Sequence, residues 1–368
     1  MNCFIIGTRA EYIKTFPLML EMQKRNINYI FIHTGQHELS DLCKTFDTKT
    51  PNITLTIPPK KTTKFFGNTA KAIIWNIELV FKIKNELKKI NDLKYVFFHG
   101  DTMTTASAAI ASSSFMNQSK DWKNVHLEAG LRSEDLFEPF PEEISRKIAD
   151  KFSDVLLAVS ERAKQNLKKE GIKGKIIVTG NTVIDSARIA LAKSNKNKHQ
   201  KTPKKYAILT LHRHENIKSK ERLADILSII EACPLPILFP LHDNTKKKLE
   251  EFGLLDRLIS NKNIILTENQ NYPGFIYLVS KASLLLTDGG SIQEESLIFK
   301  KPCILLRKAT ERQEGLETGI NYLSRLNVED TKKKMNEYLK IKKVKDFRNP
   351  FGEGDISKKI MDNLQFKN

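Results

Sequence analysis

The sequence Leu284-Leu285-Leu286-Thr287-Asp288-Gly289-Gly290-Ser291-Ile292-Gln293-Glu294-Glu295-Ser296 joins an apolar run to two glycines and a second patterned segment. The apolar run is typical of a buried parallel strand. After the glycines, Ile292, Ser296 and Leu297 recur at helical spacing, which predicts a helix. The stretch therefore predicts a strand, a tight turn and a helix, the repeating unit of α/β folds.

The turn in this stretch has the features of a phosphate-binding site. Gly289 and Gly290 allow close approach of the backbone to a ligand, and Ser291 is predicted to cap the helix. The unpaired amides at a helix start favour an anion such as a diphosphate. Glu294 or Glu295 could also accept both hydroxyl groups of a ribose. An ordinary Gly-Gly-Ser turn before a well-capped helix explains the same residues, so the rest of the chain must distinguish the two interpretations.

Predicted strands and helices alternate in two successive series. A polar, lysine-rich stretch at 193–205 ends the first series. Two such series predict two doubly wound α/β domains, with the ligand in the cleft between the carboxyl ends of the two sheets. The predicted strands are 2–6, 29–33, 95–99, 125–127, 155–159 and 175–178 in the first series, and 206–211, 236–241, 264–267, 284–287 and 303–306 in the second.

The composition is that of a soluble globular protein. The 368 residues suffice for two domains with a core each, and 40% are hydrophobic and 28% charged. No apolar run has membrane-spanning length, and the chain begins directly with a strand, so neither membrane insertion nor a signal peptide is expected. The four cysteines are scattered without metal-ligand spacing. We therefore expect a cytoplasmic protein with buried thiols.

The net charge of +18 raises the possibility of a nucleic-acid-binding protein. The lysines, however, are spread along the whole chain. The densest runs, 193–205 and 332–345, contain few of the aromatic residues that usually accompany basic groups in nucleic-acid sites. We therefore interpret the charge as solvated helix faces and loops, and expect no nucleic-acid partner.

Ionisable residues follow several of the predicted buried strands. Three carboxylates at such positions would shift each other's proton affinities if they faced one cleft, as acid/base catalysis requires. Helix caps and salt bridges explain each residue taken singly, but explain the joint occurrence less well. The residues are Arg9 with Lys14, Asp101, Glu128 and the run His212-Arg213-His214-Glu215, with Glu142 after the loop at 135–141.

The histidines are poorly placed for a metal site. His33 and His37 have i, i+4 spacing, but the segment runs from a strand end through a glycine turn instead of along a helix. His212 and His214 are separated by one residue, which suits a shared metal poorly. We expect no metal site.

Ten segments, in order from end to end, resemble the UDP-N-acetylglucosamine 2-epimerase family. The resemblance implies two Rossmann-like domains in a glycosyltransferase B-type arrangement, at 1–185 and 186–348, with 349–368 crossing back to the first. Family members are commonly homodimers. The segments are GTRAEYIKTFPLM (7–19), TGQH (34–37), HGDTMTT (99–105), HLEAGLRS (126–133), PFPEEISRK (139–147), TGNTVID (179–185), LHRHEN (211–216), TDGGSIQEES (287–296), TERQE (310–314) and NPFGEGDIS (349–357).

The resemblance implies a reaction and a set of residues. Members of the family expel UDP from carbon 1 of the sugar while a base removes the hydrogen on carbon 2, and UDP then adds back to 2-acetamidoglucal. Acid/base groups around the ring and cations on the diphosphate suit this path. No metal or nicotinamide cofactor is implied. The implied catalytic residues are Asp101, Glu128, Glu142 and His212, the implied UDP-sugar contacts are Arg9, Lys14, Arg132, Arg213, Gly289, Gly290, Ser291, Glu295 and Arg312, and a possible activator site comprises Gln36, His37 and His242.

The chain departs from the family pattern at several places, among them the following three. The family usually has Asp-Ser-Gly-Gly where this chain has residues 288–291, Asp-Gly-Gly-Ser. Ala10 occurs in the branch that releases UDP and free N-acetylmannosamine. Leu39 replaces a polar residue of the activator segment. Three enzymatic alternatives therefore stay open: a non-hydrolysing epimerase, a hydrolysing one, and an epimerase of a related UDP-diacetamido sugar. HGDTMTT and HLEAGLRS argue against a glycosyltransferase.

Overall fold

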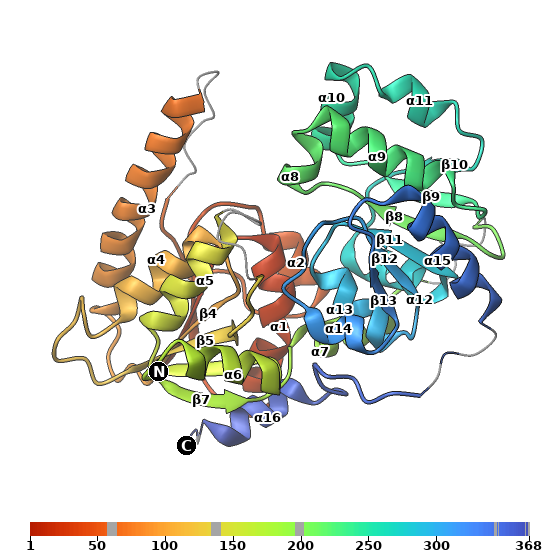
Figure 1. Ribbon diagram of the computed structural model, residues 1–368. Coiled ribbons are helices and arrows are strands. Elements are labelled where there is room, and N and C mark those ends of the chain that lie inside the picture. Colours follow the sequence, from red (N-terminus) through yellow and green to blue (C-terminus); the bar gives the residue numbers. More distant parts are fainter. Residues whose placement is uncertain are drawn as a thin grey trace. The chain divides into compact units, whose positions relative to one another are not determined.

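The computed structural model describes residues 1–56, 65–133, 141–195, 202–341, 344, 346–364 and 366, without the side chains of 65–70 (Figure 1). Most of the predicted loop at 135–141, and parts of the lysine-rich stretches 193–205 and 332–345, lie outside these residues. The chain forms two compact units, residues 1–186 with 354–368 and residues 187–353. No described helix has the length and apolar character needed to cross a membrane.

The first unit is built on a parallel sheet with the strand order β3-β2-β1-β4-β5-β6-β7. The strands are β1 (Asn2–Ile6), β2 (Tyr29–His33), β3 (Ile53–Thr54), β4 (Tyr95–His99), β5 (Lys123–Ala129), β6 (Val155–Ala158) and β7 (Lys175–Val178). The helices are α1 (Arg9–Lys24), α2 (Ser40–Thr45), α3 (Phe65–Leu87), α4 (Met103–Ser112), α5 (Glu142–Lys151), α6 (Glu161–Lys169), α7 (Val183–Ala192, which runs past the unit boundary) and α16 (Ile356–Asn363).

The second unit repeats this plan with the order β10-β9-β8-β11-β12-β13, again parallel. The strands are β8 (Ala207–Thr210), β9 (Ile237–Pro240), β10 (Ile264–Thr267), β11 (Leu284–Thr287), β12 (Cys303–Leu305) and β13 (Asn321–Leu323). The helices are α8 (His214–Ile217), α9 (Lys220–Glu231), α10 (Asp243–Glu251), α11 (Leu255–Ile259), α12 (Tyr272–Lys281), α13 (Ser291–Ile298), α14 (Gln313–Glu317) and α15 (Val328–Lys340).

Both sheets have the strand order of a Rossmann fold, so the predicted fold class of two doubly wound α/β domains is confirmed. In such sheets the chain direction of the crossovers reverses at a switch point, here between β1 and β4 and between β8 and β11. Ligands bind outside the carboxyl ends of the strands at that point. The segments after these four strands are residues 7–14, 100–105, 211–216 and 288–295, which include most of the candidate site residues.

The apolar strand patterns are explained by burial on both faces of each sheet. Every residue of β1 and β11 is buried, because helices cover both faces (Figure 1). The short edge strands β3 and β13, of two and three residues, were not predicted. Segments of that length carry too few residues for a hydrophobic period to emerge.

The last helix belongs to the first unit. α16 packs on α1, and Ile356, Ile360 and Met361 are buried. Its N-cap residue Asp355 has a left-handed backbone (φ 56°) and makes no side-chain cap. Instead, the buried carboxylate of Asp185 accepts the amide hydrogens of Ile356 (3.2 Å) and Ser357 (2.7 Å) and the Ser357 hydroxyl (2.8 Å). A carboxylate from the motif at 179–185 thus caps a helix from the motif at 349–357.

Replacing Asp185 with alanine should weaken the first unit. Three donors at the start of α16 lose their acceptor, which we expect to lower the free energy of unfolding by about 2–4 kcal/mol. Urea unfolding measures this. The control is Asp362→Ala, which removes an exposed ion pair of α16 with Arg25 and should cost less than about 1 kcal/mol. Equal losses in the two variants would contradict the cap.

Candidate functional site

The carboxylate of Glu11 connects the two turns at the switch point of the first sheet. It accepts the amide hydrogens of Gly7 (2.6 Å) and Thr8 (2.9 Å), and the Thr8 hydroxyl accepts the Glu11 amide (3.2 Å), which completes a capping box on α1. It also accepts a hydrogen bond from the hydroxyl of Thr102, the N-cap of α4. Burial raises the pKa of Glu11, although these hydrogen bonds act to lower it. The turn after β1 is thereby fixed to the turn after β4.

Lys14 and Glu128 form a buried ion pair. The Lys14 Nζ lies 2.8 Å and 2.7 Å from the two carboxylate oxygens of Glu128, and the side chains are 10% and 2% exposed. The side-chain amide of Asn181 donates to the same carboxylate at 2.6 Å. Since these residues come from α1, the end of β5 and the segment after β7, the carboxylate is held from three directions.

The backbone of Glu128 is strained. Its φ is 68°, a left-handed conformation that costs an L-residue roughly 1–2 kcal/mol. The pairing of β5 with β6 shifts register between Leu127 and Ala129, which marks a bulge at this residue. Bulges re-aim side chains and are common next to active sites. The strain is a physical reason to regard Glu128 as functional.

The Asp101 carboxylate is paired with Arg146 of α5. The same guanidinium lies 2.8 Å from Glu143, which accepts hydrogen bonds from the amide and hydroxyl of Ser133 (3.2 and 3.1 Å). Arg146 is 2% exposed and so ties the turn after β4 to the helix that begins at Glu142. The three candidate carboxylates thus occupy the turn after β4, the end of the neighbouring β5, and the start of a helix bonded to that turn.

Arg132 lies in the same set of ion pairs, on its far side from Asp101. Its guanidinium is 2.7 Å from Asp150 and 2.6 Å from Glu170. Asp150 also bonds His126 at 2.7 Å. Burial acts to raise the pKa of Asp150, but the His126 hydrogen bond and the charges of His126 and Arg132 outweigh it and lower the pKa. Arg132 Nε also lies 4.0 Å from Glu143, so Arg132 has three carboxylate partners within the protein.

Arg9, Gln36 and His37 lie together at the end of β1 and β2. The Arg9 amide donates to Nδ1 of His37 (3.3 Å), and the His37 amide donates to the carbonyl of Gly7 (3.2 Å). A Cβ on Gly7 would lie 2.8 Å from Oε1 of Gln36, so the glycine is required for this close packing. Burial and the Arg9 charge lower the pKa of His37. Both Arg9 and His37 are exposed at the surface.

In the second unit, Asp288 holds the segment that carries His212. The buried Asp288 carboxylate accepts the amide hydrogens of His212 (3.1 Å) and Arg213 (2.8 Å) and the side-chain amide of Asn216 (3.3 Å). Asp288 follows β11 and His212 follows β8, so the bond bridges the switch point. The imidazole of His212 is 53% exposed, and its Nδ1 lies 3.5 Å from Oδ1 of Asp288.

A cavity of about 240 Å³ adjoins His212. Its wall includes His242, which is the N-cap of α10 and accepts the Asn244 amide through Nδ1 (3.3 Å). Phe275 and Gln270 also line it. An aromatic face, a side-chain amide and two imidazoles form a wall that suits a nucleobase. The predicted activator residue His242 lies here in the second unit, whereas Gln36 and His37 lie in the first.

The helix α13 begins at Ser291, and its N-cap is Gly290, with no side-chain cap. The prediction that Ser291 caps this helix is therefore wrong, because Ser291 already has helical geometry and is the first helical residue. A Cβ on Gly290 would lie 2.9 Å from Nη1 of Arg312, so the glycine leaves room for the guanidinium. Glu295 is buried and accepts the hydroxyl of Tyr272 at 2.9 Å.

Buried charges surround the start of α13. Arg312 is paired with Glu311 and lies 3.3 Å from Glu294, and Arg307 lies 3.0 Å from Glu311. Burial lowers the pKa of Arg307, opposed by the charge of Glu311. Several of these side chains are below 4% exposed, so their positions are set by one another. Among the described residues, no group of three or more His, Cys, Asp or Glu side chains is arranged for a metal ion.

Residues 20–365 match the family described as UDP-N-acetylglucosamine 2-epimerase. The chain belongs to this family. It is 37% identical to the UDP-N-acetylglucosamine 2-epimerase of Methanocaldococcus jannaschii, over 97% of this chain and 96% of that protein. The suspected family resemblance is thereby confirmed.

Solved structures agree with this assignment. The M. jannaschii UDP-GlcNAc 2-epimerase in complex with UDP-GlcNAc and UDP has a TM-score of 0.86 and 36% identity, covering 100% of this chain and 99% of that one. The Neisseria meningitidis enzyme bound to UDP-GlcNAc has a TM-score of 0.85 and 32% identity, covering 100% of both chains. A glycosyltransferase of kitacinnamycin shares the fold alone, with a TM-score of 0.52, 9% identity, and coverage of 92% of this chain and 94% of that one.

Four positioning residues and one cavity-lining residue were not found by sequence reasoning: Glu11, Arg146, Asn181 and Asp288, and Gln270. The first four lie inside the segments GTRAE, PFPEEISRK, TGNTVID and TDGG, so their motifs were recognised but their roles were not. A sequence shows that these polar residues occur near strand ends, but not which partners they bond.

The strain at Glu128 predicts an unusual order of stability. Glu128→Gly should be more stable than Glu128→Ala by about 1 kcal/mol, because glycine adopts a left-handed backbone without steric cost. Urea midpoints measure the difference. At Lys123, an exposed residue of the same strand with an ordinary backbone, the glycine variant should be less stable than the alanine variant by about 0.5–1 kcal/mol. A Glu128→Ala variant at least as stable as Glu128→Gly would show that Glu128 is unstrained.

Proposed function

We propose that this protein interconverts UDP-N-acetylglucosamine and UDP-N-acetylmannosamine. The observation that carries the proposal is full-length membership of a family whose relative at 37% identity bears that enzyme name. The polar groups at the switch points support the proposal. In the first unit, carboxylates and cations lie together at the strand ends, and in the second unit a helix begins among buried ionic groups. No metal or nicotinamide cofactor is needed for this chemistry.

The proposed reaction is an anti elimination followed by re-addition. A base removes the proton from carbon 2 as the bond between carbon 1 and the UDP oxygen breaks, which leaves 2-acetamidoglucal and UDP. UDP then adds back to carbon 1 while a proton is delivered to the opposite face of carbon 2. We propose that Asp101, Glu128, Glu142 and His212 supply the acid/base groups.

The diphosphate leaves with additional negative charge, which cations and helix amides stabilise. We propose that Arg9, Lys14, Arg213 and Arg312 supply the cations, and that Gly289, Gly290 and Ser291 supply backbone donors. The amides at the start of α13 serve whether or not the Ser291 hydroxyl takes part. Glu295 is proposed to bind the ribose, and the Phe275 cavity the base. Since Arg132 pairs with Asp150 and Glu170, we propose that it supports this region through those contacts.

Proton NMR of the protein with UDP-N-acetylglucosamine in deuterated water tests the reaction. We expect deuterium at carbon 2 of recovered UDP-hexosamine, because the proton returned to carbon 2 comes from an exchangeable carboxylate. Manno product without deuterium would contradict elimination. Release of free N-acetylmannosamine would favour a hydrolysing enzyme, the alternative suggested by Ala10, and turnover only of a UDP-diacetamido sugar would favour the third alternative.

Removing single carboxylates should abolish turnover without unfolding the protein. We expect Asp101→Asn, Glu128→Gln and Glu142→Gln each to lose at least ~100-fold in kcat, the usual range for a lost acid/base group. The control is Glu161→Gln, an exposed carboxylate of α6, which should keep normal turnover. Near-normal rates in two of the three variants would show that those carboxylates serve structure alone.

We also propose that the protein is a homodimer that pairs through α3. Trp75, Leu79, Ile83 and Leu87 of this helix are buried within the unit. On its other side, the side chains of Ile73, Ile74, Ile77 and Phe81 are all more than 50% exposed. A second apolar stripe on a helix is normally buried against a further partner, and Figure 1 shows α3 at the margin of the first unit. A second copy of the same helix would cover this stripe by two-fold symmetry.

The double variant Ile77→Asp/Phe81→Asp should be a monomer, because two charges would enter the apolar contact. Light scattering after gel filtration measures the mass. Ile259→Asp is the control, since Ile259 on α11 is equally exposed, at 55%, and should leave the dimer intact. A monomeric wild-type protein, or a double variant that is still a dimer, would contradict the proposal that α3 forms the interface.

We propose three further features of this protein. Activation by a second UDP-sugar through Gln36, His37 and His242 is an open proposal that substrate-saturation kinetics would test. A cytoplasmic location is supported by four buried free cysteines, which suit a reducing compartment. Supply of a nucleotide sugar for polysaccharide biosynthesis follows from the proposed product.

A further inference from the structure

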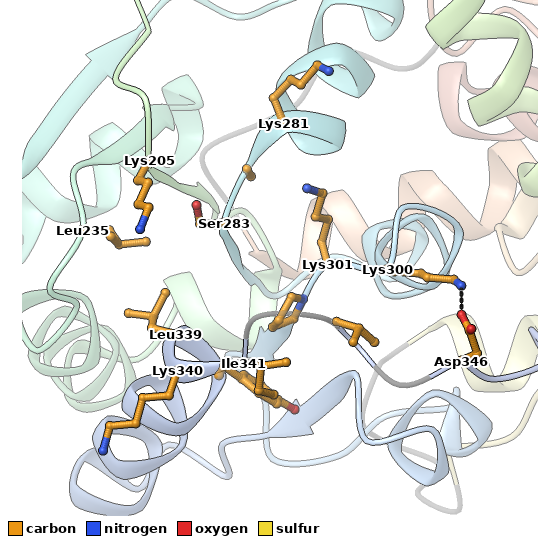
Figure 2. Close-up of a pocket in the computed structure, with 14 residues that line it drawn as sticks. Lys205, Leu235, Lys281, Ser283, Lys300, Lys301, Leu339, Lys340, Ile341 and Asp346 are labelled. Carbon is orange, nitrogen blue, oxygen red and sulfur yellow. Dashed lines mark hydrogen bonds and ion pairs between the residues drawn. The ribbon is translucent and has the colours of Figure 1, made fainter.

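A cavity of about 620 Å³ lies at the amino edge of the second sheet (Figure 2). Lys205 comes just before β8, Ser283 just before β11, and Lys301 with Pro302 just before β12. These three strands are neighbours in the sheet and parallel, so the segments before them share one edge. His212 and Asp288 follow the same strands at the other edge. A four-residue strand at 3.3 Å per residue separates the two edges by roughly 13 Å.

Most of the lysines around this cavity have no acidic partner. Lys205, Lys281, Lys301 and Lys340 line it, and none forms an ion pair with another described residue. The acidic lining residue Asp346 is already paired with Lys300 at 2.6 Å. Burial lowers the pKa of Lys301, and the positive charge of Lys281 lowers it further. The cavity therefore holds uncompensated positive charge, which an anion would relieve.

The arrangement of the side chains narrows the choice of anion. In Figure 2, Lys205 and Leu235 lie on one side of the cavity and Lys301 on the other, while the ammonium groups of Lys281 and Lys340 point away from them. Leu235, Pro302, Leu339 and Ile341 provide apolar walls. The volume is typical of a small-molecule pocket, whereas a nucleic-acid duplex needs an extended surface. The chemistry thus suits a compact molecule with several negative charges and an uncharged organic part.

We propose that this cavity binds an organic phosphate of two or more negative charges, such as a nucleoside diphosphate, at a site separate from the carboxyl edge. Lys205 and Lys301 contact the phosphates as point charges. Leu235, Pro302 and Leu339 cover the organic part. The site does not depend on the proposed epimerase activity, because none of its residues belongs to that machinery.

Titration calorimetry with ADP tests the site. We expect the wild-type protein to bind ADP, and Lys205→Gln/Lys301→Gln to bind it at least ~10-fold more weakly, since two charge-assisted contacts are lost. The matched control is Lys220→Gln/Lys262→Gln, which removes two exposed lysines of the same unit that do not line the cavity and should leave ADP affinity unchanged. Affinity should also fall as salt rises.

One further variant and two further probes make the result decisive. Glu295→Ala should weaken UDP binding but not ADP binding at this site; ADP binding that is lost in Glu295→Ala and kept in Lys205→Gln/Lys301→Gln would place ADP in the proposed UDP site and overturn the inference. Inorganic pyrophosphate should bind more weakly than ADP. Equal affinities would contradict the proposed contact between the apolar walls and the organic part of the ligand. Tighter, lysine-dependent binding of a single-stranded oligonucleotide would replace the inference with a nucleic-acid site. Absence of ADP binding to the wild-type protein would contradict the proposed phosphate site, whether or not the protein is an epimerase.

Discussion

The reversal of crossover direction at the two switch points is the constraint on which the rest of the structure depends. In each sheet the strand that comes first along the chain lies beside the one that comes fourth, β1 beside β4 and β8 beside β11. Helices leave these neighbours toward opposite faces, so the ends of the strands are not covered by their own crossovers. Polar side chains can then stand at the end of a buried sheet without entering its core. Glu11 in one unit and Asp288 in the other each bridge such a pair of turns.

The candidate site is held by charges that are paired inside the protein. Lys14 with Glu128, Arg146 with Asp101 and Glu143, and Arg312 with Glu311 are each nearly or wholly excluded from water on at least one side of the pair. Breaking such a pair leaves an uncompensated buried charge and is costly, although the pair itself adds little net stability. Their value is geometric, because a carboxylate fixed from several directions reorganises little when a substrate binds.

Much of the fold followed from the sequence, since buried parallel strands give apolar runs that alternate with helical spacing. The edge strands β3 and β13 were too short to show a pattern. At the site, residue types near strand ends identified Asp101, Glu128 and His212 as candidates. The sequence could not show which residues pair, because the ion pairs of Arg132 join it to Asp150 and Glu170 across 18 and 38 positions of sequence. Nor does the residue type at position 128 indicate the left-handed backbone that Glu128 adopts. Ser291 failed as a cap because a helix can begin one residue earlier than its serine suggests.

The docking of α16 on α1 affects the order in which the two units can complete their folding during synthesis. The helix occupies Ile356–Asn363, close to the end of the chain, yet it completes the unit that contains residue 1. During synthesis, residues 187–353 leave the ribosome and can fold as a unit before α16 is available. The apolar face of α1 that α16 covers stays open to water or chaperones over that whole interval. The half of the protein that is translated first is therefore the half that is finished last.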